Sequence, residues 1–202
     1  MTTPPRIVLG SRNRKKSREI AEILQPHGIE LVSIADFPQA HEVVEDGGTF
    51  AENAAKKAAE PAASLGRWVI GEDSGLIVDA LDGRPGVLSA RFSGTGATDE
   101  ANNRKLMDEL AGVPLERRTA AYTCTIALAD PAGAIRLTAE GRCRGLIIFE
   151  PRGDHGFGYD PYFLIREYHR TFGELSARVK HQMSHRARAF AAFIPGLLKL
   201  FR

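Results

Sequence analysis

The chain has 202 residues, of which 43% are hydrophobic, and a formal net charge of +2. That length and apolar content suffice for one full core, so we expect a single domain over residues 1–202, built as two lobes that share one sheet. The small net charge argues against a protein that binds nucleic acid through a large basic excess. No apolar run reaches the length of a membrane span, and the first one is too short for a signal peptide.

The two cysteines, Cys124 and Cys143, lie in strand-like segments among apolar residues. Such cysteines are typical of reduced thiols in a protein core. The sequence therefore predicts a soluble protein of the cytoplasm.

Apolar periodicity predicts alternating strands and helices in the first part of the chain. Residues 6–10 form a β-branched run of strand length, followed by a polar loop and a helical pattern. Residues 29–34 indicate a second strand, and residues 49–59 an alanine-rich helix that opens with a T-x-x-E capping box. We expect Pro61 and Gly66 to end that helix.

The next segment, RWVIGEDSGLIVDAL at residues 67–81, is predicted to form two short strands on either side of an acidic turn. Residues 98–112 follow as a helix, with Thr98 or Asp99 as its cap and Gly112 as its stop.

A β-hairpin is the clearest signal in the second half, with strands at residues 120–129 and 134–143 joined by the turn DPAG. Residues 145–149 are expected to form a third strand beside them. A helical pattern returns at residues 184–201, interrupted by Pro195. This order of elements predicts an α/β fold with a mixed sheet flanked by helices.

The basic loop SRNRKK, residues 11–16, leaves a strand and enters a helix. Backbone N–H groups at a helix start have no intrahelical partners and favour an anion, to which Lys16 would add a charge. Phosphate is the natural ligand. A solvated basic helix start is the alternative, because the loop lacks the known phosphate-binding glycine patterns.

Glu72 and Asp73 are adjacent carboxylates between glycines after an apolar run. Burying both without partners would cost several kcal/mol, so they need a cation, and Mg²⁺ suits carboxylate oxygens and phosphate together. An exposed turn is the alternative. Glu45 and Asp46 form a second acidic pair, which is either a flexible acidic loop or the source of a third carboxylate for the metal.

The segment HGFGYDPYF, residues 155–163, places aromatic residues between glycines, which suits either the stacking of a flat ligand or an ordinary core. His181 and His185 have the i, i+4 spacing of a zinc pair if that segment is helical. The segment lacks the glutamate of H-E-x-x-H, so hydrogen bonding to a base or phosphate is favoured.

Five blocks in order over nearly the whole chain resemble the inosine triphosphate pyrophosphatase family, which hydrolyses non-canonical purine nucleoside triphosphates. These blocks are S-x-N-x-x-K at residues 11–16, TFAENAAKKA at 49–58, DSGLIVDALDGRPGVLSARFSG at 73–94, GFGYDP at 156–161 and SHR at 184–186. The resemblance implies a two-lobed α/β fold with a long central mixed sheet, an active-site cleft between the lobes, and a homodimer. It also implies Mg²⁺-dependent cleavage between the α- and β-phosphates of ITP, dITP or XTP, which releases a monophosphate and pyrophosphate.

The resemblance further implies roles for individual residues. Asp73 would be the base for the attacking water, and Lys16 and Lys57 would offset charge on the leaving pyrophosphate. The triphosphate would be held by Ser11, Arg12, Asn13, Arg14, Lys15, Lys16 and Lys57. Mg²⁺ would be bound, directly or through water, by Glu45, Glu72 and Asp73. Ser74 would lie against the substrate. The nucleoside would be framed by Phe157, Gly158, Tyr159, Asp160 and Lys180, and its 6-oxo group would be contacted by His185 and Arg186.

Two other functions fit parts of the sequence. A Maf-like nucleotide pyrophosphatase would share the chemistry with another base preference, although the SHR block argues against it. A non-catalytic nucleic-acid-binding module could use the two basic clusters, but the acidic pairs would repel a phosphate backbone. We expect a purine nucleoside triphosphate as the partner, and neither nucleic acid nor membrane.

Overall fold

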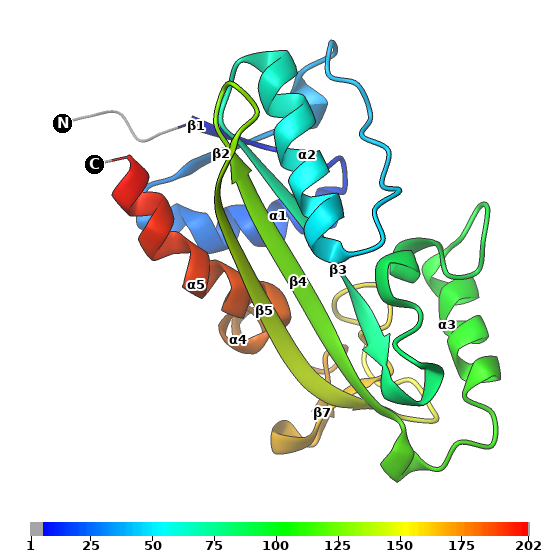
Figure 1. The fold of residues 1–202 in the computed structure, drawn as a ribbon. Helices are drawn as coiled ribbons and strands as arrows, with labels where there is room; N and C mark the ends of the chain where they lie inside the picture. The colour runs from blue at the N-terminus through cyan, green and yellow to red at the C-terminus, as the bar shows by residue number, and fades with distance from the viewer. Residues whose placement is uncertain (1–5, 202) are drawn as a thin grey trace. The chain divides into compact units, whose positions relative to one another are not determined.

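The computed structural model of the protein describes residues 6–201, which form strands and helices in an α/β order (Figure 1). The strands are β1 (Arg6–Leu9), β2 (Glu30–Ser33), β3 (Val69–Val78), β4 (Thr119–Ala129), β5 (Ile135–Ile147), β6 (Phe163–Ile165) and β7 (Arg170–Thr171). The α-helices are α1 (Arg14–Leu24), α2 (Phe50–Leu65), α3 (Asp99–Glu109), α4 (Ala177–Met183) and α5 (His185–Leu200).

The strands form one seven-stranded sheet in the order β2-β1-β3-β4-β5-β6-β7. β1 pairs in parallel with β2 and with β3, whereas β6 pairs antiparallel with β5 and with β7. The predicted mixed sheet flanked by helices is therefore confirmed.

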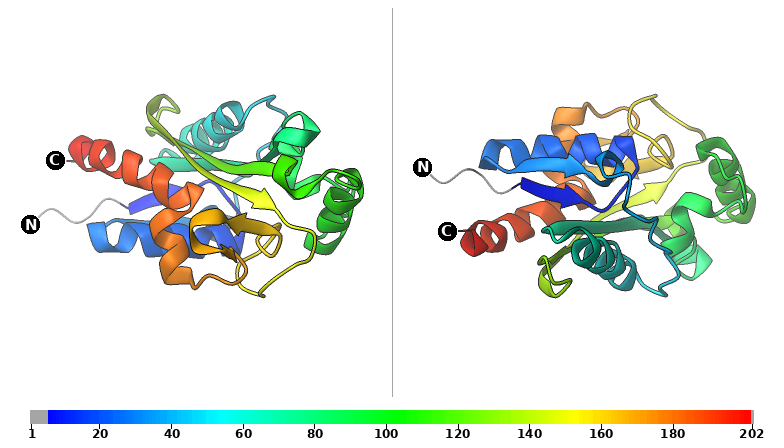
Figure 2. Two further views of the ribbon diagram at one scale, coloured as in Figure 1. Left: turned by 90° about the horizontal axis from the view of Figure 1, so that it is seen from below. Right: turned by 90° about the horizontal axis from the view of Figure 1, so that it is seen from above.

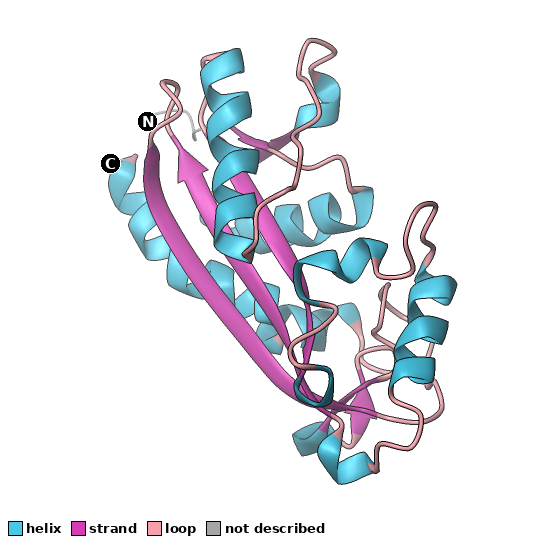
Figure 3. Cartoon of the chain, turned by 45° about the vertical axis from the view of Figure 1, so that its right-hand side comes forward, coloured by secondary structure: helices cyan, strands magenta, loops and turns pink. Residues whose placement is uncertain are grey.

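The predicted hairpin is confirmed as β4 and β5, which are long strands (Figure 3) joined by a turn in which the Asp130 N–H donates to the Ala134 carbonyl. The third strand expected at residues 145–149 is wrong, because Gly145 to Ile147 complete β5. Gly145 is a place of close contact, since a Cβ there would lie 2.5 Å from the Leu164 carbonyl oxygen in β6.

The described chain divides into two compact units. The first comprises residues 6–73, 124–141 and 186–201, and the second residues 74–123 and 142–185. The division passes through β3, β4 and β5, so the same strands contribute to the core of each unit. The core of the second unit packs the last residues of β3, the start of β4 and the end of β5 against α3, β6 and Phe172, which follows β7.

The first unit has three layers, which follow from the alternation of side chains along its strands. Ile7 and Leu9 pack with apolar residues of α1 and α5 on one face of the sheet. Val8 and Val69 pack with the alanines of α2 on the other face. Figure 2 shows α2 on one side of these strands and α1 with α5 on the opposite side.

Two glycines allow α2 to lie directly on the strands. A Cβ at Gly71 would come within 2.1 Å of the Ala54 carbonyl oxygen, and a Cβ at Gly10 within 2.1 Å of the Lys57 carbonyl oxygen. The helix continues past Pro61, so the expectation that Pro61 ends it is wrong. Proline removes the N–H that would bond the carbonyl four residues earlier, which is that of Lys57. Gly66 caps the helix in a left-handed conformation, as predicted.

The C-terminal helical segment also differs from its prediction. α5 continues through Pro195 without an interruption. α4 is a separate helix, and Ser184 between the two has an extended backbone, so His181 and His185 do not share one helix face. The two histidines therefore do not form the zinc-binding pair that an i, i+4 spacing on one helix would allow. Among residues 6–201, no helix is both long and apolar enough to cross a membrane.

We predict that Gly71→Ala lowers the free energy of unfolding by more than about 2 kcal/mol, because the new methyl group would collide with the backbone of α2. Urea unfolding measures this change. Gly48→Ala is the matched control, since a Cβ there meets nothing closer than Glu52 Oε2 at 3.6 Å. Equal stability of the two variants would contradict the close packing of α2 on β3.

Candidate active site

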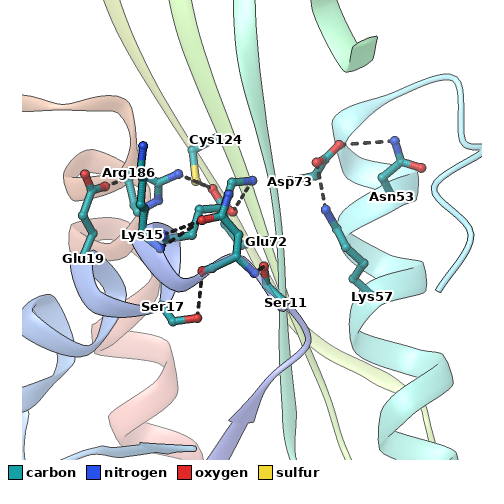
Figure 4. A network of polar contacts seen from close by, with 12 residues as sticks. Ser11, Lys15, Ser17, Glu19, Asn53, Lys57, Glu72, Asp73, Cys124 and Arg186 are labelled. Carbon is teal, nitrogen blue, oxygen red and sulfur yellow. Dashed lines mark hydrogen bonds and ion pairs between the residues drawn. The ribbon is translucent and has the colours of Figure 1, made fainter. Parts of the chain in front are cut away.

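The acidic pair lies inside a strand. β3 is continuous from Val69 to Val78, so the prediction of two strands flanking an acidic turn is wrong. Neighbouring residues in a strand point to opposite faces of the sheet. Glu72 therefore faces the side of α1 and α5, and Asp73 faces α2, as Figure 4 shows.

Glu72 is a fully buried carboxylate held by two cations. Its Oε2 lies 3.0 Å from Lys16 Nζ, and its Oε1 accepts a hydrogen bond from Arg186 Nη2 at 3.1 Å. Arg186 also forms an ion pair with Glu19. The side chain of Lys16 keeps 15% of its surface exposed while that of Glu72 keeps none, so the lysine is the member of the pair that reaches solvent.

Burial alone would raise the pKa of Glu72, but the charges of Lys16 and Arg186 outweigh it and hold the pKa well below the usual range. The thiol of Cys124 donates to Glu72 Oε1 at 3.2 Å. Burial and the Glu72 charge raise the pKa of Cys124 well above its usual value, so the group is a thiol. Cys124 and Cys143 are buried and form no disulfide, as predicted.

Asp73 has a different set of partners, all from the first unit. Lys57 Nζ lies 2.9 Å from Asp73 Oδ1 and 2.8 Å from Glu45 Oε2, so one ammonium joins two carboxylates. Asn53 Nδ2 donates to Asp73 Oδ2 at 3.2 Å. Asn53 and Lys57 are four residues apart on α2, which places both on one face of that helix.

Burial raises the pKa of Asp73, with Glu45 adding to it, although Lys57 acts in the opposite direction. Burial would lower the pKa of Lys57, but the charges of Asp73 and Glu45 raise it. Asp73 is thus a partly desolvated carboxylate of increased basicity beside a firmly charged lysine. Such a carboxylate suits a general base.

The three carboxylates predicted to share a metal are not brought together as one group. Over residues 6–201, no three Asp, Glu, His or Cys side chains gather in a metal-binding arrangement. Glu45 and Asp73 do converge on one point, where the Lys57 ammonium lies. Glu72 is turned away to the opposite face of β3.

The basic loop forms the start of α1. The Asn13 side chain caps the helix by accepting from the backbone N–H groups of Lys15 and Lys16, at 3.0 and 3.2 Å, and Ser11 Oγ accepts from the Asn13 N–H at 3.3 Å. Arg12 Nη2 donates to the Ala40 carbonyl at 2.8 Å. Arg14 and Lys15 are exposed. The loop therefore presents cations and a helix N-terminus at the place where Lys16 meets Glu72.

In the second unit, a buried ion pair forms the centre of the GFGYDP segment. Lys180 Nζ lies 2.7 Å from Asp160 Oδ2, which also accepts from the Phe157 N–H at 2.9 Å. The ammonium lies 5.1 Å from the centre of the Phe157 ring. Gly156 makes room for this carboxylate, because a Cβ there would lie 2.0 Å from Asp160 Oδ2.

The other residues predicted to contact the substrate lie outside the ion pair of Asp160 and Lys180. Tyr159 is a core residue, with 3% of its surface exposed and its hydroxyl donating to the Ser89 carbonyl at 2.8 Å. The Gly158 N–H donates to Asp99 Oδ2. His185 stacks on the Tyr122 ring at 4.7 Å. Ser74 follows Asp73 in β3 and is half-buried.

The structure thus gathers the predicted phosphate and carboxylate residues in the first unit and most of the predicted nucleoside residues in the second. Arg186 is the exception, because it belongs to the first unit and is bound to Glu19 and Glu72. Neither the role of Asn53 nor the contact between Cys124 and Glu72 was predicted from the sequence. Asn53 stands within the TFAENAAKKA block, four residues before Lys57, and that helical spacing was the available signal.

Comparisons with known proteins show the family to which the chain belongs. Residues 7–196 match the sequence model of the Ham1 family. A Rhodopirellula baltica protein named dITP/XTP pyrophosphatase is 54% identical over 96% of this chain and 93% of its own length. A solved structure of a HAM1 protein from Coxiella burnetii is 35% identical, with a TM-score of 0.86 over 98% of this chain and 100% of its own.

A third relative has both a name and a structure. The Mycobacterium abscessus protein, described as a nucleoside-triphosphatase or dITP/XTP pyrophosphatase, is 45% identical with a TM-score of 0.76, over 93% of this chain and 97% of its own. The chain belongs to the Ham1 family.

We predict that Glu72→Gln lowers the free energy of unfolding by about 3 kcal/mol at pH 7, because Lys16 and Arg186 lose a buried counter-charge. A depressed folded pKa stabilises the protein above the unfolded pKa of about 4.3, and this contribution is lost as pH falls below it. The difference between wild type and variant should therefore shrink from pH 5 towards pH 3.

Chemical unfolding at several pH values measures this, with Glu140→Gln as the control because Glu140 is exposed. If the difference in the free energy of unfolding between wild type and Glu72→Gln stayed constant from pH 7 to pH 3, Glu72 would not be held ionised by its cations.

Proposed function

We propose that this protein is a nucleoside triphosphate pyrophosphatase that hydrolyses non-canonical purine nucleotides, namely ITP, dITP and XTP, to the monophosphate and pyrophosphate. The names of the relatives from R. baltica and M. abscessus support this class of substrate. The single observation that carries the proposal is the convergence of Lys57, Glu45 and Asp73 beside the basic loop of the same unit.

The residues present fit Mg²⁺. Glu45 and Asp73 direct carboxylate oxygens at one cation, the Lys57 ammonium, and such oxygens are the ligands that Mg²⁺ prefers. We therefore assign the binding of the ion to Glu45 and Asp73. Glu72 instead has a structural role, which is to hold Lys16 and Arg186 in place. When bound, the ion would supply positive charge that offsets the charge of the phosphates.

Asp73 acts as the general base for the attacking water. Its raised pKa, caused chiefly by burial, makes it a stronger proton acceptor than an exposed aspartate. As Asp73 takes the proton, the water oxygen bonds to the α-phosphorus, and the bond to the bridging oxygen breaks. Lys16 and Lys57 offset the negative charge that develops on the departing pyrophosphate.

The residues around Asp160 and His185 in the second unit serve the nucleoside. Phe157, held beside the Lys180 ammonium, offers a partly exposed ring for stacking on a flat base. His185 would donate to the 6-oxo group, which adenine replaces with an amino group that is itself a donor. This difference disfavours ATP.

The matched family argues against a Maf-like enzyme. Lys16 and Arg186, which a nucleic-acid-binding surface would need, are ion-paired with Glu72. A homodimer and a cytoplasmic location stay predictions.

We predict Mg²⁺-dependent release of pyrophosphate from dITP, ITP and XTP, with ATP and GTP far slower. Asp73→Asn should lower kcat at least about 100-fold, because the base is lost while the side chain keeps its size. A coupled pyrophosphate assay measures both results.

Asp108→Asn, an exposed position on α3, serves as the matched control and should retain full activity. Equal turnover of ATP and dITP would reject the substrate class, and undiminished activity of Asp73→Asn would reject the assigned base.

A further inference from the structure

We propose that Asn53 is a positioning residue that holds Asp73 and the segment carrying Glu45 in one arrangement. We call residues 41–48, which lie between Ala40 and the start of the α2 cap, the strap. The catalytic part of this inference rests on the proposed function, whereas its structural part does not.

One side-chain amide joins β3 to the strap. Asn53 is fully buried, its Nδ2 donates to Asp73 Oδ2 at 3.2 Å, and its Oδ1 accepts from the Gly47 N–H at 2.9 Å. Nδ2 also donates to the Gly47 carbonyl at 3.5 Å, so both ends of the amide contact Gly47 while Nδ2 alone contacts Asp73. Because the amide is planar, these contacts together fix its orientation.

Asn53 completes a closed ring of contacts. Lys57, one turn later on α2, binds the other oxygen of Asp73 and also Glu45. Glu45 and Gly47 both belong to the strap, so Asn53 and Lys57 each hold both the strap and Asp73. Lys57 supplies the charge, and Asn53 supplies a directed neutral donor that sets the rotation of the Asp73 carboxylate.

The sequence of the strap carries a separate sign of this contact. A Cβ at Gly47 would lie 2.7 Å from Asn53 Oδ1 and 2.8 Å from Glu52 Cβ. Glycine at this position therefore lets the strap backbone lie directly on Asn53.

Other contacts of the strap are less able to fix it. Lys56 pairs with Asp46 at the surface, where ion pairs contribute little. Glu52 accepts from the Gly48 N–H at 2.7 Å, but this bond is exposed. The Asn53 side chain is fully buried, and its removal would leave both the Gly47 N–H and Asp73 Oδ2 short of a partner.

Hydrogen–deuterium exchange of the free protein tests the structural part without any nucleotide. We expect Asn53→Ala to speed exchange in a peptide covering the strap severalfold. The control is Asn102→Ala, because Asn102 is a similarly buried asparagine on α3 that ties the Ser93 N–H and the Ala90 carbonyl. That variant should change exchange near residues 90–93 and leave the strap as in wild type.

Steady-state kinetics tests the positioning part. Asn53→Ala should lower kcat about 10- to 100-fold with KM changed by less than about threefold, whereas Asn102→Ala should keep kcat within about twofold. Asn53→Asp is the second variant and is matched in size. It still tests the role of Asn53 towards Asp73 if the alanine variant does not fold. It keeps an acceptor for the Gly47 N–H but turns an oxygen towards Asp73 and loses the long contact with the Gly47 carbonyl. We therefore expect strap exchange much closer to wild type than that of Asn53→Ala, together with reduced kcat.

Unchanged strap exchange in Asn53→Ala would overturn the proposal that Asn53 holds the strap. An Asn53→Asp variant with wild-type kcat would overturn the role towards Asp73. If wild type itself did not hydrolyse dITP, the proposed function would fail, and the exchange result would still decide the structural part.

Discussion

The burial of two neighbouring carboxylates on opposite faces of one strand constrains the rest of the first unit. Glu72 and Asp73 lie in β3 with almost no exposed surface, and each must have partners because an unpaired buried charge costs several kcal/mol. Strand geometry sends the two side chains to different layers. The partners consequently come from different helices, Lys16 and Arg186 on one face and Asn53 and Lys57 on the other.

These pairings explain features that apolar packing alone does not. The backbone of α2 lies directly on β3 at Gly71, which brings Lys57 within reach of Asp73. The start of α1 is capped by Asn13, which fixes the helix turn that carries Lys16. The two faces also divide the chemistry. On the α1 and α5 face, Glu72 is paired with two cations and is suited to a structural role. On the α2 face, Asp73 keeps a raised pKa and has the more exposed Glu45 as a neighbour.

The elements of the fold could be predicted from the sequence where residues close together in the chain determine the local structure. The capping box, the cap at Thr98 and the hairpin around residues 130–134 depend on neighbouring residues, and all three are confirmed. Failures occurred where tertiary contacts overrode local signals. Pro61 and Pro195 lie inside helices, and Gly145 lies inside β5 because β6 packs closely on it. The side chains of Glu72 and Asp73 could be assigned to opposite faces only once the segment was known to be one strand, because a turn would have allowed both to face one ion.

The assignment of the metal to Glu45 and Asp73, with Glu72 excluded, is tested most directly by Mn²⁺ binding. Electron paramagnetic resonance can follow free Mn²⁺ in the presence of a non-hydrolysable ITP analogue. We expect Glu45→Gln to weaken Mn²⁺ binding strongly and folded Glu72→Gln to bind nearly as wild type does. Equal weakening in both variants would contradict the division of the two carboxylates between the faces of β3.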